Sequence, residues 1–231
     1  MSYDIHLYTA STMNGWKPVI FLEEAQIPYE VTHINFDTNE QKSQWYLDLN
    51  PNGRIPTIID RGNNDLVIFE SGAILWYLAE KYDIFLSHDP KERIQTMQWL
   101  MFQVGGLGPM MGQAMFFQRI AAPKGQVEPF SIARYVGESR RLLEVLNRHL
   151  EGKKYLVGEA YSIADIAMYP WARCFYWAKV SVEGLIHLQS WFDRIDKRPL
   201  TQKALTIPEP FPAFFGHGDI AKMEKQNAER F

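Results

Sequence analysis

The sequence predicts an α/β domain with the element order βαβαββα over residues 1–82, followed by an all-helical domain over residues 90–231. Within the first domain, stretches in which apolar and polar residues alternate are interleaved with stretches of helical spacing. After Tyr82 the alternation stops, and only helical spacing recurs. A short polar segment, residues 83–89, separates the two patterns, and we take it as a linker between two domains.

The first half of the α/β domain is predicted to be a parallel β-α-β unit. Ile5 and Leu7 alternate with polar neighbours in a first strand, and the helix that follows has Pro18 in its first turn, where proline is tolerated. Pro28 stops this helix, and residues 29–36 alternate again as a second strand. Two strands joined through a helix form a parallel pair.

The second half begins with a short helical segment, residues 41–49, and continues as an antiparallel hairpin. Pro56 opens a third strand that ends at Asp60, and a polar turn joins it to a fourth strand over residues 66–69. The last helix of the domain spans residues 71–81. The complete order is that of a thioredoxin-like domain, with helices on both faces of a mixed sheet.

Two long helices of the second domain are predicted from apolar faces at helical spacing. These faces consist of Ile94, Met97, Met101, Val104 and Gly108 in one helix and of Tyr135, Leu142, Leu143, Leu146 and Leu150 in the other. Ser162 and Asp165 have the spacing of a capping box, so a further helix begins there. We expect Pro170 to kink that helix. The tail after Pro208 is predicted to drape over the surface or to be loosely ordered.

The composition is that of a soluble globular protein. The chain has 231 residues, 46% of them hydrophobic, and a net charge of -3, so it can form a substantial core and has no basic run for nucleic acid or an anionic membrane. No stretch approaches the roughly 20 apolar residues of a membrane span, and residues 1–4 lack the features of a leader peptide. Together with the single Cys174, which excludes an internal disulfide, these features predict a cytosolic protein.

Metal, nucleotide and protein-thiol chemistry find little support in the sequence. The six histidines are scattered without the spacing of zinc ligands. Residues 105–109 contain three glycines, but they interrupt a predicted helix and follow no strand. We interpret them as positions of close packing, with Pro109 bending the helix. Cys174 is expected to be a buried hydrophobic residue rather than a nucleophile.

The start of the predicted helix 71–81 has two interpretations. Position 74 is Ile, so no capping box satisfies the first N–H groups, and such a helix start favours an anion. With Glu70 available for an ammonium group, Glu70 and Ser71 suit the head group of an α-amino acid. The alternative is that Ser71 is an ordinary cap of a solvated helix.

The loop after the first strand, residues 8–15, is the second candidate site. In a thioredoxin-like domain this loop precedes a helix N-terminus, where a thiolate is stabilised. No cysteine occupies the loop here, so a reacting sulfur must arrive with a ligand and accept hydrogen bonds from Thr12, Asn14 or Tyr8. The alternative is that Thr12 and Asn14 are turn or capping residues and that Tyr8 packs in the core.

Three motifs occur together: Asn-Pro-Asn-Gly-Arg-Ile-Pro at residues 50–56, Phe-Glu-Ser-Gly-Ala-Ile at residues 69–74 and Ser-Ile-Ala-Asp at residues 162–165. With them the chain resembles a cytosolic glutathione transferase over residues 4–200. Residues 12–15 and 103–110 are similar to the bacterial nu class and to the fungal group around the yeast nitrogen regulator. In those groups a Thr-x-Asn pair replaces the usual catalytic Tyr, Ser or Cys.

The resemblance implies a glutathione site with a role for each matching residue. Glu70 and Ser71 would hold the γ-glutamyl group, in agreement with the amino-acid interpretation of this helix start. The backbone N–H and C=O of Ile55, before a cis peptide bond to Pro56, would pair with the cysteinyl unit.

The resemblance also assigns the two other ends of the ligand. Gln41 and Arg54 would lie on the side of the glycine carboxylate. Thr12 and Asn14 would face the sulfur and lower its pKa by hydrogen bonding to the thiolate. Arg134 would reach the ligand from the second subunit of a homodimer.

The nu-like resemblance implies a glutathione-dependent disulfide reductase that holds two glutathione molecules or glutathione disulfide. Its partners would be glutathione and a small disulfide or electrophile, and no protein cysteine would react. Conjugation or peroxidase activity on small electrophiles remains open, and so does a non-catalytic glutathione-binding regulatory module. Residues 211–231 match nothing in the family pattern.

Overall fold

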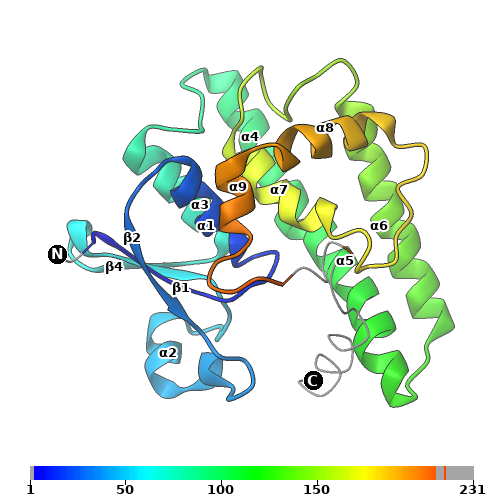
Figure 1. The fold of residues 1–231 in the computed structure, drawn as a ribbon, viewed down its shortest axis with the longest axis horizontal. Coiled ribbons are helices and arrows are strands. Elements are labelled where there is room, and N and C mark those ends of the chain that lie inside the picture. Colours follow the sequence, from blue (N-terminus) through cyan, green and yellow to red (C-terminus); the bar gives the residue numbers. More distant parts are fainter. Residues whose placement is uncertain (1–2, 212–215, 217–231) are drawn as a thin grey trace. The chain divides into compact units, whose positions relative to one another are not determined.

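The computed structural model describes residues 3–211 and Gly216, and these form two compact units (Figure 1). The first unit contains residues 3–93 together with residues 196–211, and the second contains residues 94–195 and Gly216. Residues 196–211 lie within the range predicted for the helical domain, yet they pack with the first unit. Both ends of the continuously described chain therefore belong to the first unit. The rest of the tail predicted after Pro208 lies outside the described residues.

A four-stranded mixed sheet forms the centre of the first unit, with the strand order β2-β1-β3-β4. Its strands are β1 (Ile5–Thr9), β2 (Tyr29–His33), β3 (Thr57–Asp60) and β4 (Leu66–Phe69). β1 runs parallel to β2, and β3 runs antiparallel to both β1 and β4. The prediction of a parallel first half and an antiparallel second half is confirmed.

Helices lie on both faces of this sheet. The first unit contains α1 (Trp16–Glu24), α2 (Gln44–Leu49), α3 (Ser71–Tyr82) and α9 (Pro199–Ala204), with the 3-10 turns η1 (Glu40–Lys42) and η2 (Arg61–Asn63). α1 packs against α3 and α9. The ring of Tyr46, on α2, is 6.3 Å from the ring of Tyr8, on β1. Because side chains alternate along a strand, Tyr8 faces α2, and Leu7 faces the α1 layer.

Side-chain pairs fasten α9 to α1. The guanidinium of Arg198 donates to both carboxylate oxygens of Glu24 at 2.9 and 2.6 Å, and the hydroxyl of Thr201 donates to the same carboxylate at 2.6 Å. Lys203 pairs with Glu23 at 2.7 Å. The Glu24 side chain is only 5% exposed, so this forked pair is more than a solvated surface contact.

The described residues of the second unit form helices joined by loops, with no strand among them. It contains α4 (Pro90–Phe102) from Ile94 onward, α5 (Gly108–Met115), α6 (Pro129–His149), α7 (Ile163–Arg173) and α8 (Ile186–Asp196) up to Ile195. Two π-helical segments, η3 (Gln103–Leu107) and η4 (Phe116–Ala121), flank α5, and a 3-10 turn, η5 (Ala122–Lys124), follows.

The apolar face predicted for the helix that begins with α4 is only partly buried: Gly108 is buried, and Met97 and Val104 are half-buried. Ile94 and Met101 are 57% and 54% exposed, whereas Thr96, Leu100, Gln103 and Leu107 are buried. Apolar residues follow helical spacing on two sides of this helix, and the π-helical turn at η3 changes the spacing after Phe102.

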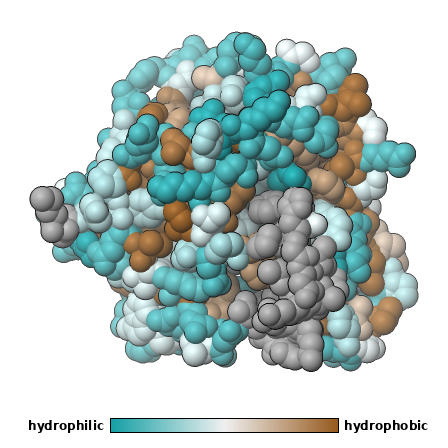
Figure 2. All heavy atoms as spheres, in the orientation of Figure 1, coloured by the Kyte–Doolittle hydropathy of each residue, from teal (hydrophilic) through white to brown (hydrophobic). Residues whose placement is uncertain are grey.

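Hydrophilic residues lie among apolar ones on the face seen in Figure 2. No helix in the described part of the chain is long and apolar enough to cross a membrane.

The capping box at the start of α7 is confirmed. The Ser162 side chain accepts from the backbone N–H of Ala164 at 3.3 Å, and the Asp165 carboxylate accepts from the backbone N–H of Ser162 at 3.1 Å. Asp165 is fully buried and also accepts from Trp191 Nε1 at 2.9 Å and from the N–H of Leu156 at 3.0 Å. Burial raises the pKa of Asp165 to about 6, against the opposing effect of the hydrogen bonds, of which that from Trp191 is the largest.

Close packing is confirmed at Gly108 but not at Gly105, where an added Cβ would meet nothing within 4 Å, and Gly112 packs in the same way as Gly108. A Cβ added to Gly108 or Gly112 would lie 3.4 or 3.5 Å from the indole of Trp171, on α7. The two glycines are one helical turn apart, so they form a shallow surface on α5 against which the indole lies. Pro170 lies inside α7, as predicted.

Candidate functional site

Strand register brings three predicted segments to one end of the sheet. Tyr8, near the end of β1, is opposite Thr57, the first residue of β3. Thr57 is in turn opposite Phe69, the last residue of β4. The loop after β1, the Ile55-Pro56 segment before β3 and the Glu70-Ser71 turn after β4 must therefore lie side by side. This end of the sheet is the candidate functional site.

The loop after β1 is tightly wound. The Thr9 hydroxyl donates to the carbonyl oxygen of Gly15 at 3.0 Å, and the N–H of Gly15 donates to the Thr12 hydroxyl oxygen at 3.1 Å. Position 15 requires glycine, because a Cβ there would lie 2.0 Å from the carbonyl oxygen of Ala10. The N–H of Trp16 donates to the carbonyl oxygen of Thr12 at 2.9 Å, which leads directly into α1.

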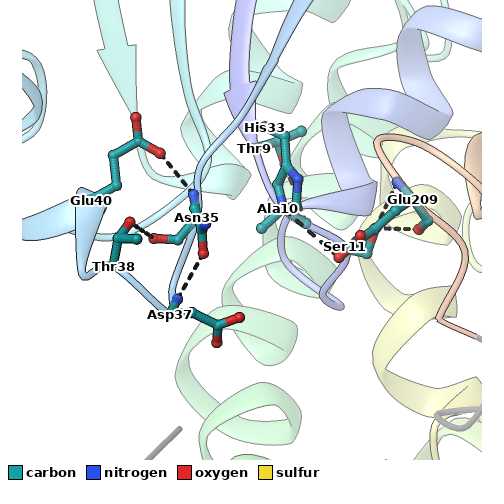
Figure 3. Close-up of polar contacts among 9 residues, drawn as sticks. All are labelled: Thr9, Ala10, Ser11, His33, Asn35, Asp37, Thr38, Glu40 and Glu209. Atoms are coloured by element: carbon teal, nitrogen blue, oxygen red, sulfur yellow. Dashed lines mark hydrogen bonds and ion pairs between the residues drawn. The ribbon is translucent and has the colours of Figure 1, made fainter. Parts of the chain in front are cut away.

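The three candidate sulfur contacts, Tyr8, Thr12 and Asn14, and their neighbour Ser11 have different surroundings. Tyr8 lies on the face of the sheet that α2 covers, and its ring is 5.9 Å from the ring of Trp45. Burial raises the pKa of its phenol. The Ser11 hydroxyl bonds to the backbone of Glu209 (Figure 3). Thr12 is a turn residue, as in the alternative interpretation, because its hydroxyl oxygen accepts the hydrogen bond from the N–H of Gly15. The hydroxyl proton of Thr12 is not used in that bond and can be donated to a ligand. Thr12 and Asn14 are both half-buried.

The start of α3 is not capped by Ser71. The N-cap residue is Glu70, no side-chain bond caps the helix, and Ser71 is its first residue. The capping interpretation of Ser71 is therefore wrong. Glu70 has φ 71°, a left-handed conformation that costs a non-glycine residue about 1–3 kcal/mol and is typical of ligand sites. Its side chain is exposed, whereas Ser71 is buried.

Lys17 is the functional candidate that the sequence motifs missed. Its side chain has 0% exposure, and its Nζ donates to Ser71 Oγ at 3.1 Å. Burial lowers the pKa of Lys17 to about 7, and the nearby Glu70 carboxylate opposes this shift. A sequence signal did exist: Lys17 is the only charged residue in the otherwise uncharged stretch 16–22.

The segment before β3 offers an unpaired stretch of backbone. The peptide bond between Ile55 and Pro56 is cis, as the family resemblance implies. Within residues 3–211, neither the N–H nor the carbonyl of Ile55 has a hydrogen-bond partner. The preceding carbonyl, that of Arg54, accepts from Asn50 Nδ2 at 2.7 Å and from the Tyr46 hydroxyl at 2.9 Å. Ile55 therefore follows a carbonyl that is held by two hydrogen bonds, while its own backbone N–H and C=O remain available to a ligand.

Gln41 is close to the same segment. Gly53 has φ 60°, and a Cβ there would lie 2.8 Å from the carbonyl oxygen of Gln41, so the loop and η1 are in contact. The side-chain oxygen of Gln41 is buried and has no hydrogen-bond partner within the described residues. The turn leading to η1 is held by Asn35, whose N–H donates to Glu40 at 2.8 Å (Figure 3). The Arg54 side chain is exposed.

Arg134 lies in the second unit, on α6, with an exposed side chain. Its contact with a ligand stays a prediction. Cys174, in the same unit, is fully buried, and burial raises the pKa of its thiol far above the usual range. Among the residues that the structure describes, no cluster of three or more His, Cys, Asp or Glu side chains could hold a metal ion.

The arrangement in the first unit suits a small peptide with charged ends. A carboxylate would find N–H groups and the Ser71 hydroxyl at the start of α3, and an ammonium group would find Glu70. A peptide backbone would pair with Ile55. An anionic sulfur would find Thr12 and Asn14 in front of the N-terminus of α1.

Comparisons with known proteins match both units. The model of the glutathione S-transferase N-terminal domain matches residues 3–80, and that of the glutathione S-transferase C-terminal domain matches residues 131–199. The chain is 45% identical to the disulfide-bond oxidoreductase YfcG of Escherichia coli K12 over 205 residues, which cover 87% of this chain and 94% of YfcG.

Solved structures give the same picture. A glutathione transferase of Pseudomonas putida with one glutathione disulfide per subunit is 43% identical, with a TM-score of 0.84 over 89% of this chain and 92% of the other. One of Burkholderia graminis, with two glutathione molecules per subunit, is 39% identical, with a TM-score of 0.83 and 89% coverage of both chains. The nitrogen regulation fragment of the yeast prion protein Ure2p is 30% identical, with a TM-score of 0.83 over 89% of this chain and 97% of the fragment. The resemblance to both groups is confirmed.

Proposed function

Because the chain belongs to the glutathione S-transferase family, we propose that it reduces small disulfides with glutathione as the thiol donor. The observation that carries this proposal is the loop after β1. It contains Thr12 and Asn14 but no cysteine, and it lies at the same end of the sheet as the Ile55-Pro56 segment. The reacting sulfur must therefore belong to the ligand, as it would in a reaction between glutathione and a disulfide. The name of the relative YfcG, a disulfide-bond oxidoreductase, supports the same reaction.

Glutathione would lie across the end of the sheet. Its γ-glutamyl carboxylate would bind the N–H groups and hydroxyl at the start of α3, and its ammonium group would pair with Glu70. The cysteinyl backbone would pair with Ile55. The glycine carboxylate would extend towards Gln41 and Arg54, where a charge-assisted bond is available.

The thiol would ionise in front of α1. Hydrogen bonds from Thr12 and Asn14 favour the thiolate and lower its pKa. This thiolate attacks one sulfur of the substrate disulfide, forms a new S–S bond and releases the other half as a thiolate, which takes up a proton. A second glutathione thiolate then attacks the glutathione sulfur of the mixed disulfide and releases the remaining thiol. The substrate gains two electrons, and the two glutathiones leave as glutathione disulfide.

The reaction needs two glutathiones at one site. The Pseudomonas putida relative binds one glutathione disulfide per subunit and the Burkholderia graminis relative binds two glutathiones, so we propose that this chain accommodates either. Arg134 of a second subunit is proposed as a further contact. We also propose a cytosolic location, since the reaction depends on reduced glutathione.

We propose a homodimer on the basis of apolar residues that each unit exposes. β4 is an edge strand, and its Leu66 and Phe69 are 41% and 38% exposed. An exposed apolar edge favours association. In the second unit, Ile94 and Met101 are exposed on α4. Light scattering after size-exclusion chromatography measures the mass, and a mass near 27 kDa at micromolar concentration would contradict the dimer.

Two assays on the wild-type protein test the proposed reaction. We expect glutathione-dependent reduction of hydroxyethyl disulfide to proceed faster than transfer of glutathione to a chloronitrobenzene. Faster transfer would assign conjugation instead. Negligible turnover in both assays, with glutathione still bound, would indicate a binding module without catalysis.

A further inference from the structure

We propose that Lys17 is a positioning residue of the glutathione site, whose buried amino group directs the Ser71 hydroxyl proton towards the γ-glutamyl carboxylate. The inference rests on the proposed function, because it concerns how that ligand is held. Lys17 need not touch the ligand. It acts through Ser71, which lies between it and the proposed carboxylate position.

The geometry of the pair supports this role. Lys17 is in the first turn of α1 and Ser71 is the first residue of α3, so the bond between Nζ and Oγ at 3.1 Å links two helix N-termini. A lysine ammonium has only donors, and a hydroxyl has one proton and two acceptor positions. When Lys17 donates to Ser71 Oγ, the Ser71 proton must point elsewhere. Ser71 does not cap α3, so its proton is available to a ligand.

The burial of Lys17 argues for a function beyond packing. Lys17 is fully buried, and its neighbours in the sequence, Trp16 and Pro18, are buried as well. Burial of an ammonium group is costly, and a methionine of similar length would fill the same space without that cost. A lysine at this position has a physical reason if its amino group acts on a ligand through Ser71.

A bound carboxylate would change the charge state of Lys17. In the free protein burial lowers its pKa to about 7, so both charge states are populated near neutral pH. A carboxylate on the far side of Ser71 favours the ammonium form and raises this pKa. Ligand binding near neutral pH is then coupled to uptake of a fraction of a proton per site.

Glu70 is the charged group that acts on Lys17, and several charged groups of the elements around α1 have partners of their own. Glu70, before α3, is the carboxylate whose field raises the pKa of Lys17. At the far end of α3, Lys81 pairs with Asp60. On α9, Arg198 and Lys203 pair with Glu24 and Glu23, at the opposite end of α1. On β1, His6 bonds to Thr32 and Arg61.

Titration calorimetry with S-methylglutathione tests the proposal. This ligand has no thiol proton, so any proton exchange comes from the protein. We expect Lys17→Met to weaken binding about tenfold, the effect of losing one hydrogen bond to a charged group. In the Ser71→Ala background, Lys17→Met should weaken binding less than it does in wild type, since only the electric field of the ammonium remains when the hydroxyl is absent.

Two controls separate positioning from a structural effect. Lys203→Met removes a positive charge that faces the other end of α1 and should leave the affinity unchanged. An S-methylglutathione analogue that lacks the γ-glutamyl α-carboxylate should bind wild type and Lys17→Met equally well. Wild type titrated at pH 7 in two buffers of different ionisation enthalpy should take up a measurable fraction of a proton per site. This last measurement needs no variant that must fold.

Each contrary outcome has a distinct meaning. Equal loss of affinity from Lys17→Met with and without Ser71 would overturn the proposal and assign Lys17 to the fold. Tight binding by Lys17→Met, or no proton uptake by wild type, would also overturn it. If wild type fails to bind S-methylglutathione at all, the proposed function fails together with this inference. If wild type binds and Glu70→Ala binds weakly while Lys17→Met is normal, only the role of Lys17 fails.

Discussion

Ser11 and Glu209 are 198 positions apart, and their polar groups bond in both directions (Figure 3). The Ser11 hydroxyl donates to the carbonyl oxygen of Glu209, and the N–H of Glu209 donates back to the same hydroxyl at 3.3 Å. The Glu209 carboxylate lies 3.8 Å from Nε2 of His33. The segment after α9 therefore rests on the loop that contains Thr12 and Asn14.

Ser11→Ala should loosen this loop without removing a proposed ligand contact. We expect the kcat of disulfide reduction to fall a few-fold, because misplaced donors stabilise the thiolate less well. The KM for glutathione should change little. Ser190→Ala, which removes an exposed hydroxyl on α8, is the matched control. A normal kcat in Ser11→Ala would show that the loop keeps its shape without Glu209.

Asn14→Ala should lower the kcat of disulfide reduction about 10- to 100-fold, since it removes a donor to the developing charge on sulfur. The pKa of the bound glutathione thiol, followed by its ultraviolet absorbance, should rise. Affinity for S-methylglutathione should be retained. Asn63→Ala, an exposed change in η2, controls for the loss of an amide. Unchanged kinetics would remove Asn14 from the mechanism and leave Thr12 as the donor.

Glu70→Gly should separate stability from binding. Glycine adopts the left-handed backbone of this position without strain, so we expect the unfolding free energy to rise by about 1 kcal/mol. Loss of the carboxylate should weaken glutathione binding about tenfold. Thermal melts and calorimetry measure the two effects. Glu70→Gln keeps the strain and should weaken binding without stabilising the fold; equal affinities for both variants and wild type would exclude Glu70 from the site.

Asp165 should make the stability depend on pH. Its pKa is about 6 in the folded protein and 3.8 in a model peptide, so the folded state binds the proton more tightly. The stability that this proton contributes is fully present below about pH 4 and is lost as the pH rises through 6. The unfolding free energy of wild type, relative to that of Asp165→Asn, should therefore decrease as the pH rises from 4 to 7. Urea titrations measure it, and a difference that does not change with pH would contradict the assignment.

Removing the side chain altogether is a separate test. Asp165→Ala leaves the indole N–H of Trp191 and the N–H groups of Leu156 and Ser162 without their buried acceptor. We expect a loss of about 3 kcal/mol in unfolding free energy. Asp193→Ala, at an exposed position of α8, should cost less than about 0.5 kcal/mol. Similar losses in both variants would contradict the structural role of the capping box.

Local patterns were sufficient for most of the fold. Alternation in β1 and the Ser162–Asp165 spacing each reflect interactions within a few residues, and the structure agrees with them. α1 ends at Glu24, before the predicted stop at Pro28. The buried face of α4 was not predictable in this way. Ile94 and Met101 follow helical spacing as well as Leu100 does, and only contacts with distant helices decide which side is inside.

The site was predictable where its chemistry follows from short motifs. Thr12, Asn14, Glu70 and Ser71 were identified because they stand next to helix starts. Lys17 was not, since its role depends on a bond to a residue 54 positions away. A charged residue in an apolar helix is the signal that identifies such positions.

The clasp between α9 and α1 has a consequence for synthesis. Glu24 emerges from the ribosome early, but its partners Arg198 and Thr201 follow about 170 residues later. At typical rates of synthesis this interval lasts on the order of ten seconds or more. During that time α1 exposes the surface that α9 later covers. The packing of α1, which is made early, is thus among the last to be completed. A pause in translation after α1 and before α9 would prolong the period in which α1 is open to misfolding.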